Sequence, residues 1–476
     1  MKSFQSLFVL FSILFLCDSC KKENNPDPPV VTATGIEWIS HADSPSFSIA
    51  MAQDIQTDAS GNIFIVGYAD NPVVFGTISM NDFTYGSSFL AKMNSKGEFV
   101  WVKDIARSNS PNILLEIDSR GNPVICFQYS ALPVHNNLQD ILSTGDNNIG
   151  LAKFSSEGLH MWSVGGGSVN NGDYPVCMAI DPNDNLFVSG SFFSYTTFQD
   201  KTLTEKFNVK GTFIAKFDGG GKCSWIRESN EIKYDHQSDY NEAAVYAMAC
   251  DSKGNCYVSG RYTSQLNFLG YNISTNNMSG FIGRVNAIGN CDWISPQHIA
   301  FPIFKSLTVD KNDNLFCGGA SAENVQLTEA SALFTSTNKL LFAKLSASQK
   351  WLWAKELVET NRAIPEMGST CNDMDCDNQG NFYFTGNSNG ATTIGSNSFN
   401  TSSGMEEMIY AAKLSPDGDA LWLKVNNLAD AAALSRCLSV DANNNCYVAG
   451  FRNRAFSMEE QKLDDGRGVF VTKIKQ

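Results

Sequence analysis

The sequence predicts an all-β fold, a seven-bladed β-propeller with four-stranded blades. Three observations lead to it. One short motif recurs seven times along the chain, a second motif alternates with it, and a strand-like segment ahead of the first copy supplies the strand that the last copy lacks. Each motif consists of two β-rich runs around a turn, so that one repeat provides four strands, and four-stranded units repeated radially form a propeller.

The first motif, as in QTDASGNIFIVG, places an asparagine four positions after an aspartate in all seven copies. The aspartates are Asp58, Asp118, Asp181, Asp251, Asp310, Asp377 and Asp441. Such a residue can accept backbone N–H groups at the start of a type I turn, and the position three later holds Gly, Asp or Asn, which tolerate a left-handed backbone. Calcium is the alternative, but each turn offers one or two carboxylates where calcium takes roughly six to eight oxygens. We therefore expect structural turns and no bound metal.

The second motif, as in FLAKMNSKGEFVW, places a cation nine residues before a tryptophan in six copies. The pairs are Lys92 and Trp101, Lys153 and Trp162, Lys216 and Trp225, Arg284 and Trp293, Lys344 and Trp353, and Lys413 and Trp422. A basic ring or a sugar-binding set of tryptophans is conceivable. One cation per blade in an acidic protein favours packing of the aliphatic stems and indole rings between strands.

The seventh copy of the second motif, FVTKIKQ, ends with the chain and has no tryptophan. The segment Gly35 to Ser40 contains Trp38 and is predicted to close the last blade, which removes an exposed sheet edge. Successive aspartates are 59 to 70 positions apart, longer than a common propeller repeat of roughly 40–50. The excess between the two motifs predicts a small extra hairpin in segments such as VVFGTISM, FQDKTLTEKF, LNFLGYNIST and TTIGSNSF.

Residues 1–19 have Lys2 followed by an apolar run too short to cross a bilayer comfortably, which predicts a secretory signal. They resemble a bacterial lipoprotein signal peptide, in which the cysteine after a small residue carries the lipid. Cys20 follows a small residue and is the predicted lipid anchor, residues 20–33 are polar and proline-rich and predict a flexible tether, and residues 34–476 form the propeller.

The two repeat motifs resemble the bacterial β-propeller repeat family called SBBP, with its D-x-x-G-N-x-Y-V-x-G and F-x-A-K-x-x-x-x-G-x-x-x-W halves. Local departures are Gln349, where other copies have the turn glycine, and Pro123 in the second run of the second copy. The SCKKE start resembles lipoproteins of the Bacteroidota, which implies an outer-membrane protein facing either the cell surface or the periplasm. The family resemblance implies fold more than activity.

Composition narrows the function classes. A net charge of −14 disfavours nucleic acid as a partner. No nucleophile elbow, phosphate loop or zinc-binding spacing occurs, which predicts a protein without enzymatic activity or cofactor. Eleven cysteines follow Cys20, an odd number in a compartment that permits disulfides, and a cross-strand bridge between Cys250 and Cys256 is conceivable.

Strand alternation separates two faces of the predicted ring. If strands A to D run outward from the axis, the A–B and C–D turns lie on one face, the turn face. The B–C and D–A connections lie on the other, the loop face, and they are long and variable. We expect a protein or glycan to bind the loop face, chiefly at the long connection 227–243. The alternative is a surface polysaccharide-active enzyme with its site on the same face. The candidate ligand-binding residues are Phe192, Phe193, Tyr234, His236, Tyr240, Arg261 and Tyr262.

Overall fold

The computed structural model describes residues 35–476 with internal gaps. The gaps are residues 46–48, 71, 82–85, 109, 131–137, 139–140, 142–147, 169–171, 194, 205–209, 232–243, 263–264, 276–278, 301, 322–338, 361–370, 389–390, 401–407 and 428–432. Thr32–Gln476 forms one compact unit, distinct from Met1–Val31. Every regular element in the described ranges is a β-strand, and no helix there is long and apolar enough to cross a membrane.

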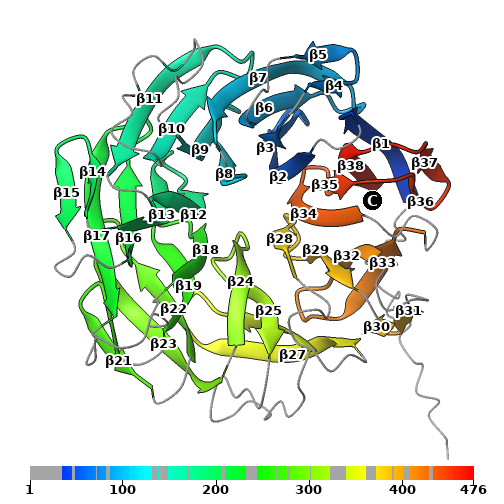
Figure 1. Cartoon of the computed structure of the whole chain (residues 1–476). Helices are drawn as coiled ribbons and strands as arrows, with labels where there is room; N and C mark the ends of the chain where they lie inside the picture. The colour runs from blue at the N-terminus through cyan, green and yellow to red at the C-terminus, as the bar shows by residue number, and fades with distance from the viewer. Residues whose placement is uncertain are drawn as a thin grey trace, which may run out of the picture. The chain divides into compact units, whose positions relative to one another are not determined.

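Seven four-stranded antiparallel blades follow one another around a ring, as predicted (Figure 1). The first three blades consist of β2 (Ala50–Thr57), β3 (Ile63–Ala69), β6 (Ser87–Met93) and β7 (Phe99–Arg107); β8 (Ile113–Ile117), β9 (Pro123–Tyr129), β10 (Asn148–Phe154) and β11 (His160–Gly167); and β12 (Tyr174–Ile180), β13 (Leu186–Phe193), β16 (Lys210–Phe217) and β17 (Cys223–Glu231). The next three consist of β18 (Ala244–Cys250), β19 (Cys256–Tyr262), β22 (Ser279–Val285) and β23 (Cys291–Ala300); β24 (Pro302–Val309), β25 (Leu315–Ser321), β26 (Lys339–Leu345) and β27 (Trp351–Thr360); and β28 (Asp373–Cys376), β29 (Phe382–Ser388), β32 (Met408–Leu414) and β33 (Ala420–Val425).

The seventh blade combines both ends of the ring. Its inner strands are β34 (Ala433–Val440), β35 (Cys446–Arg452) and β38 (Gly468–Lys475), and its outermost strand is β1 (Gly35–Asp43). β1 pairs antiparallel with β38, from Gly35 opposite Lys475 to Asp43 opposite Gly468. The predicted closure by the N-terminal strand is confirmed, and Figure 1 shows β1 beside β38.

The extra hairpins are also present, between the second and third strands of their blades. They are β4 (Val73–Phe75) with β5 (Ile78–Met80), β14 (Tyr195–Phe198) with β15 (Lys201–Thr204), β20 (Gln265–Phe268) with β21 (Tyr271–Ser274), β30 (Ala391–Ile394) with β31 (Asn397–Asn400), and β36 (Phe456–Met458) with β37 (Gln461–Leu463). The sequence did not predict which strands these hairpins would pair with. The first four each pair with the outermost strand of the preceding blade, so that β4 extends β1, β14 extends β11, β20 extends β17 and β30 extends β27.

The hydrophobic core of the described residues is divided among the blade interfaces. Seven clusters occur, and each contains residues from two adjacent blades. The cluster between blades seven and one, for example, joins Tyr447 and Val471 to Ile55 and Phe89. The alternating strands bury both sides of each sheet against its neighbours, so the ring is held by blade-to-blade packing around its whole circumference.

Candidate functional site

The aspartates of the first motif shape their own turns. In blade one, Asp58 Oδ1 accepts the backbone N–H groups of Ser60 and Asn62 at 2.9 Å, and Asn62 Nδ2 donates to Asp58 Oδ2 at 2.7 Å. The same three bonds recur in the other six blades. Both carboxylate oxygens are therefore engaged within the turn, and the structural interpretation is confirmed. Within the described residues, no group of three or more His, Cys, Asp or Glu is arranged to hold a metal ion.

In blades two, three, five and six, the lysine of the second motif contacts the turn aspartate of its own blade. In blade six, Lys413 Nζ lies 3.3 Å from Asp377 Oδ2, and the two side chains are 2% and 0% exposed. The Lys413 ammonium also lies 4.8 Å from the centre of the Tyr383 ring, a cation–π contact. The other buried pairs are Lys153 with Asp118, Lys216 with Asp181, and Lys344 with Asp310. These lysines are internal parts of the blades rather than a basic ring on the surface.

The lysine and the tryptophan of one blade also share a hydrogen-bond acceptor in the next blade. Lys344 Nζ and Trp353 Nε1 both donate to the carbonyl oxygen of Pro416 in the following C–D turn, at 3.2 and 3.1 Å. The same arrangement occurs at two more blade boundaries, where Lys92 and Trp101 share Ser156 O, and Lys153 and Trp162 share Gly219 O. At a third boundary, Lys413 and Trp422 donate instead to the side-chain Oε1 of Gln476. At the closure, Trp38 Nε1 donates to Ser95 O of blade one at 3.3 Å. The predicted packing role of the repeated tryptophans is confirmed, and it includes a directional bond between blades.

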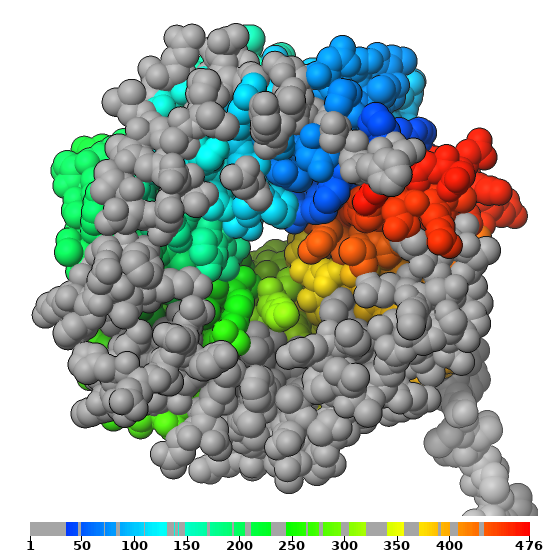
Figure 2. Space-filling view, in the orientation of Figure 1, coloured from blue at the N-terminus to red at the C-terminus, as the bar shows by residue number. Residues whose placement is uncertain are grey.

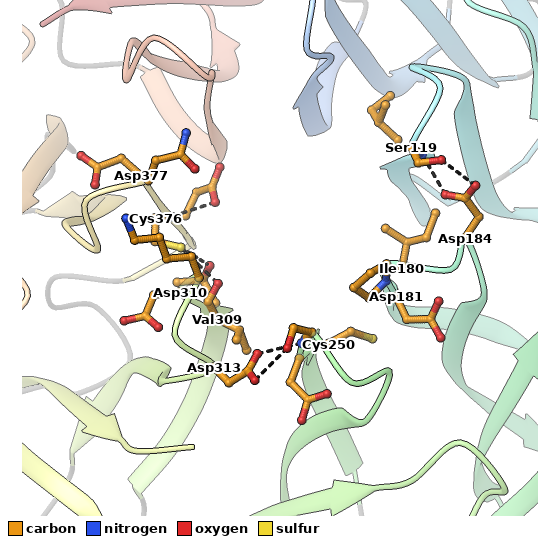
Figure 3. A pocket seen from close by; sticks show the side chains of 18 of the residues that line it. Ser119, Ile180, Asp181, Asp184, Cys250, Val309, Asp310, Asp313, Cys376 and Asp377 are labelled. Atoms are coloured by element: carbon orange, nitrogen blue, oxygen red, sulfur yellow. Dashed lines mark hydrogen bonds between the residues drawn. The ribbon is translucent and has the colours of Figure 1, made fainter. Parts of the chain in front are cut away.

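Two turns carry an additional clamp. Asp313 has a φ of 61° at the position where four other copies have glycine, and its carboxylate accepts both the backbone N–H and the hydroxyl of Ser252 in the preceding blade, each at 2.8 Å. Asp184 makes the same two bonds to Ser119. Figure 3 shows Ser119 hydrogen-bonded to Asp184, and Asp313 at the same pocket. The cost of a left-handed non-glycine residue is thus offset by hydrogen bonds to a neighbouring blade.

A cavity of about 510 Å³ lies where the A–B turns of blades two to six surround the ring axis. Its wall includes the turn aspartates of these blades together with Ser119, Ser252, Lys311 and Cys250 (Figure 3). Most of these carboxylates already accept hydrogen bonds from their own turns, so the cavity is lined by satisfied acceptors. It belongs to the turn face, opposite the face on which we expected a ligand.

A second cavity of about 300 Å³ is lined by the innermost strands and contains four acidic residues. These are Asp54, Glu116, Asp373 and Asp375, from blades one, two and six. Figure 2 shows the hollow at the centre of the ring. Three of the four link innermost strands of adjacent blades, because Asp54, Asp373 and Asp375 accept the backbone N–H groups of Leu115, Leu438 and Val440 at 2.7–2.8 Å.

Burial governs the protonation of these four groups. Removal from water raises the pKa of Asp54 to about 7 and that of Asp375 to about 6, although the backbone N–H groups that they accept act in the opposite direction. Burial also raises the pKa of Glu116 well above its ordinary value, and the negative charges of Asp54, Asp375 and Asp373 add to the shift. The pKa of Asp373 is raised well above its ordinary value for the same two reasons. The inner cavity therefore holds carboxyl groups that titrate near neutral pH or above the usual carboxyl range.

The predicted site residues that the structure describes differ in their exposure to solvent. Phe192 and Tyr262 are completely buried and pack on Phe213 and Phe281 inside their blades, so the prediction that their side chains face a ligand is wrong. Their strands end at the loop face, but strand alternation turns these two side chains into the blade interfaces. Arg261 is partly exposed at the end of β19 and lies over the Tyr246 ring.

The remaining predictions fall largely outside the described residues. Phe193 is the last residue of β13, and its side chain is not among those described; Tyr234, His236 and Tyr240 lie in the 232–243 gap, and Cys20 precedes the described residues. Cys250 and Cys256 stand opposite each other in the β18–β19 ladder as free thiols.

Sequence reasoning missed the acidic inner cavity, although a signal for it exists. Asp54 precedes its turn aspartate by four positions, Glu116 by two, and Asp373 and Asp375 by four and two. Residues two apart on a strand share one face, so charged residues at these positions of an innermost strand face the ring axis. Scanning positions two and four before each turn aspartate would have found all four.

Comparison with known proteins adds fold-level likeness alone. No family model matches the chain, and no curated protein matches it. Among solved structures, a protein of unknown function from Dyadobacter fermentans is similar over 92% of this chain and 98% of its own, at 9% identity and a TM-score of 0.42. Hydrazine synthase from Kuenenia stuttgartiensis is similar over 71% of this chain and 74% of its own, at 8% identity and a TM-score of 0.36. A glucose dehydrogenase is similar over 70% of this chain and 94% of its own, at 10% identity and a TM-score of 0.35.

Proposed function

We propose that this chain is an envelope lipoprotein, anchored to the outer membrane through Cys20, whose propeller is a non-enzymatic module for binding or assembling a protein or glycan. The signal-like start, the polar tether and the resemblance of the repeats to SBBP proteins support this proposal. The anchor holds the ring at the membrane, and the ring presents its loop-face connections as a binding surface.

The observation that carries the proposal is the contrast between the two faces. On the turn face, the repeated Asn side chains donate to the Asp of their own turn, and repeated Lys and Trp side chains donate to the next blade, as Lys344 and Trp353 do to Pro416 O. These hydrogen bonds hold the turns rigid and leave the repeated polar side chains engaged within the ring. The connections on the loop face differ in length and sequence from blade to blade, which is the usual arrangement of a rigid scaffold with binding loops.

Residues 227–231 of the predicted connection belong to β17, so within the loop face we propose residues 232–243 as the principal contact, with Arg261 beside them. This connection combines Tyr234, His236 and Tyr240 with acidic residues, and aromatic and hydrogen-bonding groups together suit both protein and sugar ligands. Phe192 and Tyr262 support the adjoining strands from the core and are not part of the proposed contact.

The test is capture of partners by the native lipoprotein from solubilised outer membranes. A variant with residues 232–243 replaced by a short Gly-Ser linker should lose the captured partner. The matched control carries Arg120→Ser and Lys253→Ser, two exposed changes on the turn face, and should retain it. Loss in the control with retention in the shortened variant would overturn the assignment of the face. Unchanged membrane association and lipid labelling of Cys20→Ala would overturn the anchor.

A second candidate is a polysaccharide-active enzyme, and the acidic inner cavity is the observation that favours it. Carboxyl groups with raised pKa values serve as general acids in glycoside hydrolysis. Asp54, Asp373 and Asp375 already accept backbone N–H groups across blade boundaries, which favours a structural role. Glu116→Gln would abolish hydrolysis of envelope polysaccharides if this candidate were correct, and unchanged turnover in that variant would dismiss it.

A further inference from the structure

Large exposed apolar side chains gather at the outer edge of the turn face. Of the eight such side chains among the described residues, six lie in a C–D turn or at the second position of the outermost strand that follows it. They are Val100, Leu159, Met161, Ile288, Leu352 and Leu421, with exposed fractions from 44% to 67%. They belong to blades one, two, four, five and six, so they are distributed around the rim rather than concentrated in one groove.

The chain also enters the ring on this face. Gly35 begins β1 opposite Lys475, next to the C-terminal residue, and Trp38 contacts Ser95 in the first C–D turn. Residues 21–34 separate Gly35 from Cys20. If these residues form the predicted tether, their average span is about 20 Å. A lipid on Cys20 would therefore hold the turn face nearer to the bilayer than the loop face.

We propose that the turn face of the ring rests on the bilayer that holds the anchor, with the rim side chains in the headgroup region. This inference rests on the proposed lipid anchor and extends it to an orientation. A flat bilayer can contact separated points around a rim at the same time. A second copy stacked on the same face would enclose both tethers between two rings and move the anchors away from the membrane. The loop face then points away from the bilayer, toward partners.

The charge of the turn face defines the lipid probe. Its exposed turn tips mix both signs, in a chain with a net charge of −14. The cations are Lys96, Arg120, Lys222, Lys253, Lys311 and Lys350, and the acidic residues are Glu98, Glu157, Asp417 and Asp419. Anionic lipids offer no clear gain to such a surface, so the expected contact is apolar and interfacial. Phosphatidylcholine vesicles, which are zwitterionic, are therefore the appropriate membrane.

The tryptophans provide a direct reporter. All eight tryptophans of the chain lie in the outermost strands close to the C–D turns, at Trp38, Trp101, Trp162, Trp225, Trp293, Trp351, Trp353 and Trp422. Bromine atoms on lipid acyl chains quench indole fluorescence at short range. The purified acylated lipoprotein is therefore reconstituted into brominated and unbrominated phosphatidylcholine vesicles, and flotation is measured alongside emission.

We expect the protein to float with both vesicles and its emission to fall in the brominated ones. The combined variant Val100→Ser, Met161→Ser, Leu352→Ser and Leu421→Ser should float equally but lose the quenching. The control Val74→Ser, exposed on β4 rather than in a C–D turn or an outermost strand, should keep it. If the wild-type protein floats but its emission is equal in both vesicles, the turn face does not rest on the bilayer and the proposed orientation is wrong. This holds whether the turn face is then free or covered by a second copy. Failure to float would instead overturn the anchor on which the inference rests.

Discussion

At the residue scale, the ring depends on buried ion pairs that the repeat pattern encodes. The seven aspartates and the lysines were visible in the sequence as separate motifs, but their contact was not predicted. Lys413 and Asp377 lie 36 positions apart, and strand pairing brings them together inside one blade. A one-dimensional pattern shows which positions repeat, whereas the partner of each side chain depends on which strands become neighbours.

Replacing a buried lysine should be costly. Lys413→Met leaves Asp377 in the interior without its cation, and breaking a buried pair from one side costs about 3 kcal/mol. The control is Lys201→Met, which removes an exposed pair with Asp200 and should cost less than about 1 kcal/mol. Urea unfolding of both variants gives the comparison. Equal midpoints for the two variants would show that the Lys413 pair contributes no more than a surface contact.

The inner-cavity carboxyls predict the direction of a pH effect. The folded pKa values of Asp54 and Asp375, about 7 and about 6, lie above their ordinary value of 3.8. The folded chain thus binds more protons than the unfolded chain between these limits. The stability that protonation provides is complete below the ordinary value and is lost as the pH rises through about 6 and 7.

The free energy of unfolding should therefore decrease between pH 5 and pH 8. Glu116→Gln removes a carboxyl group whose own pKa is raised by burial, and should make the decrease smaller. Glu157→Gln changes an exposed residue on the turn face and should leave the decrease as in the wild type. Denaturant titrations at several pH values measure this decrease in the free energy of unfolding. The same decrease in all three proteins would contradict a role for the inner cavity.

At the scale of elements, the extra hairpins link neighbouring blades. The sequence predicted that they exist, because spacing between motifs exceeded that of a four-strand repeat. It did not predict their pairing with the preceding blade, since hydrogen bonds between strand backbones leave little trace in side-chain patterns. Gly166 of β11 is a partial signal, because it lies opposite Phe198 of β14 and a side chain there would collide with the Phe198 ring.

Gly166→Val should therefore displace the β14–β15 hairpin. A Cβ at this position would lie 2.2 Å from the Phe198 ring, and forced overpacking costs roughly 1–3 kcal/mol. Gly220→Ala is the control, because residue 220 is exposed and its added Cβ would meet a single flexible side-chain atom, Asp218 Oδ1, at 3.3 Å. Hydrogen exchange of residues 195–204 should accelerate in the first variant alone. Unchanged protection there would mean that the hairpin does not depend on its contact with blade two.

At the scale of the whole molecule, the number of blades and the closure followed from counting motifs. The location of the proposed binding surface was harder to predict from the sequence. Phe192 and Tyr262 were chosen because they end strands at the loop face, but alternation turns both into the core, and a one-residue difference in register decides that outcome. The carboxyl groups of the inner cavity do not recur in every blade, so the repeat motifs did not reveal them, although the ring axis leaves one side of the innermost strands open.

The closed ring is most directly tested by removing the strand that closes it. Two chains are compared by urea unfolding, one starting at Thr34 and one starting at Ser44, so that they differ by β1 and not by the tether. β1 buries Ile36 and Ala42, packs Trp38 against blade one and covers the edge of β38. Burying large apolar side chains contributes about 1.5–3 kcal/mol each, so the shorter chain should lose about 5 kcal/mol or more and expose β38 to self-association. Equal unfolding midpoints for the two chains would contradict a ring closed by its N-terminal strand.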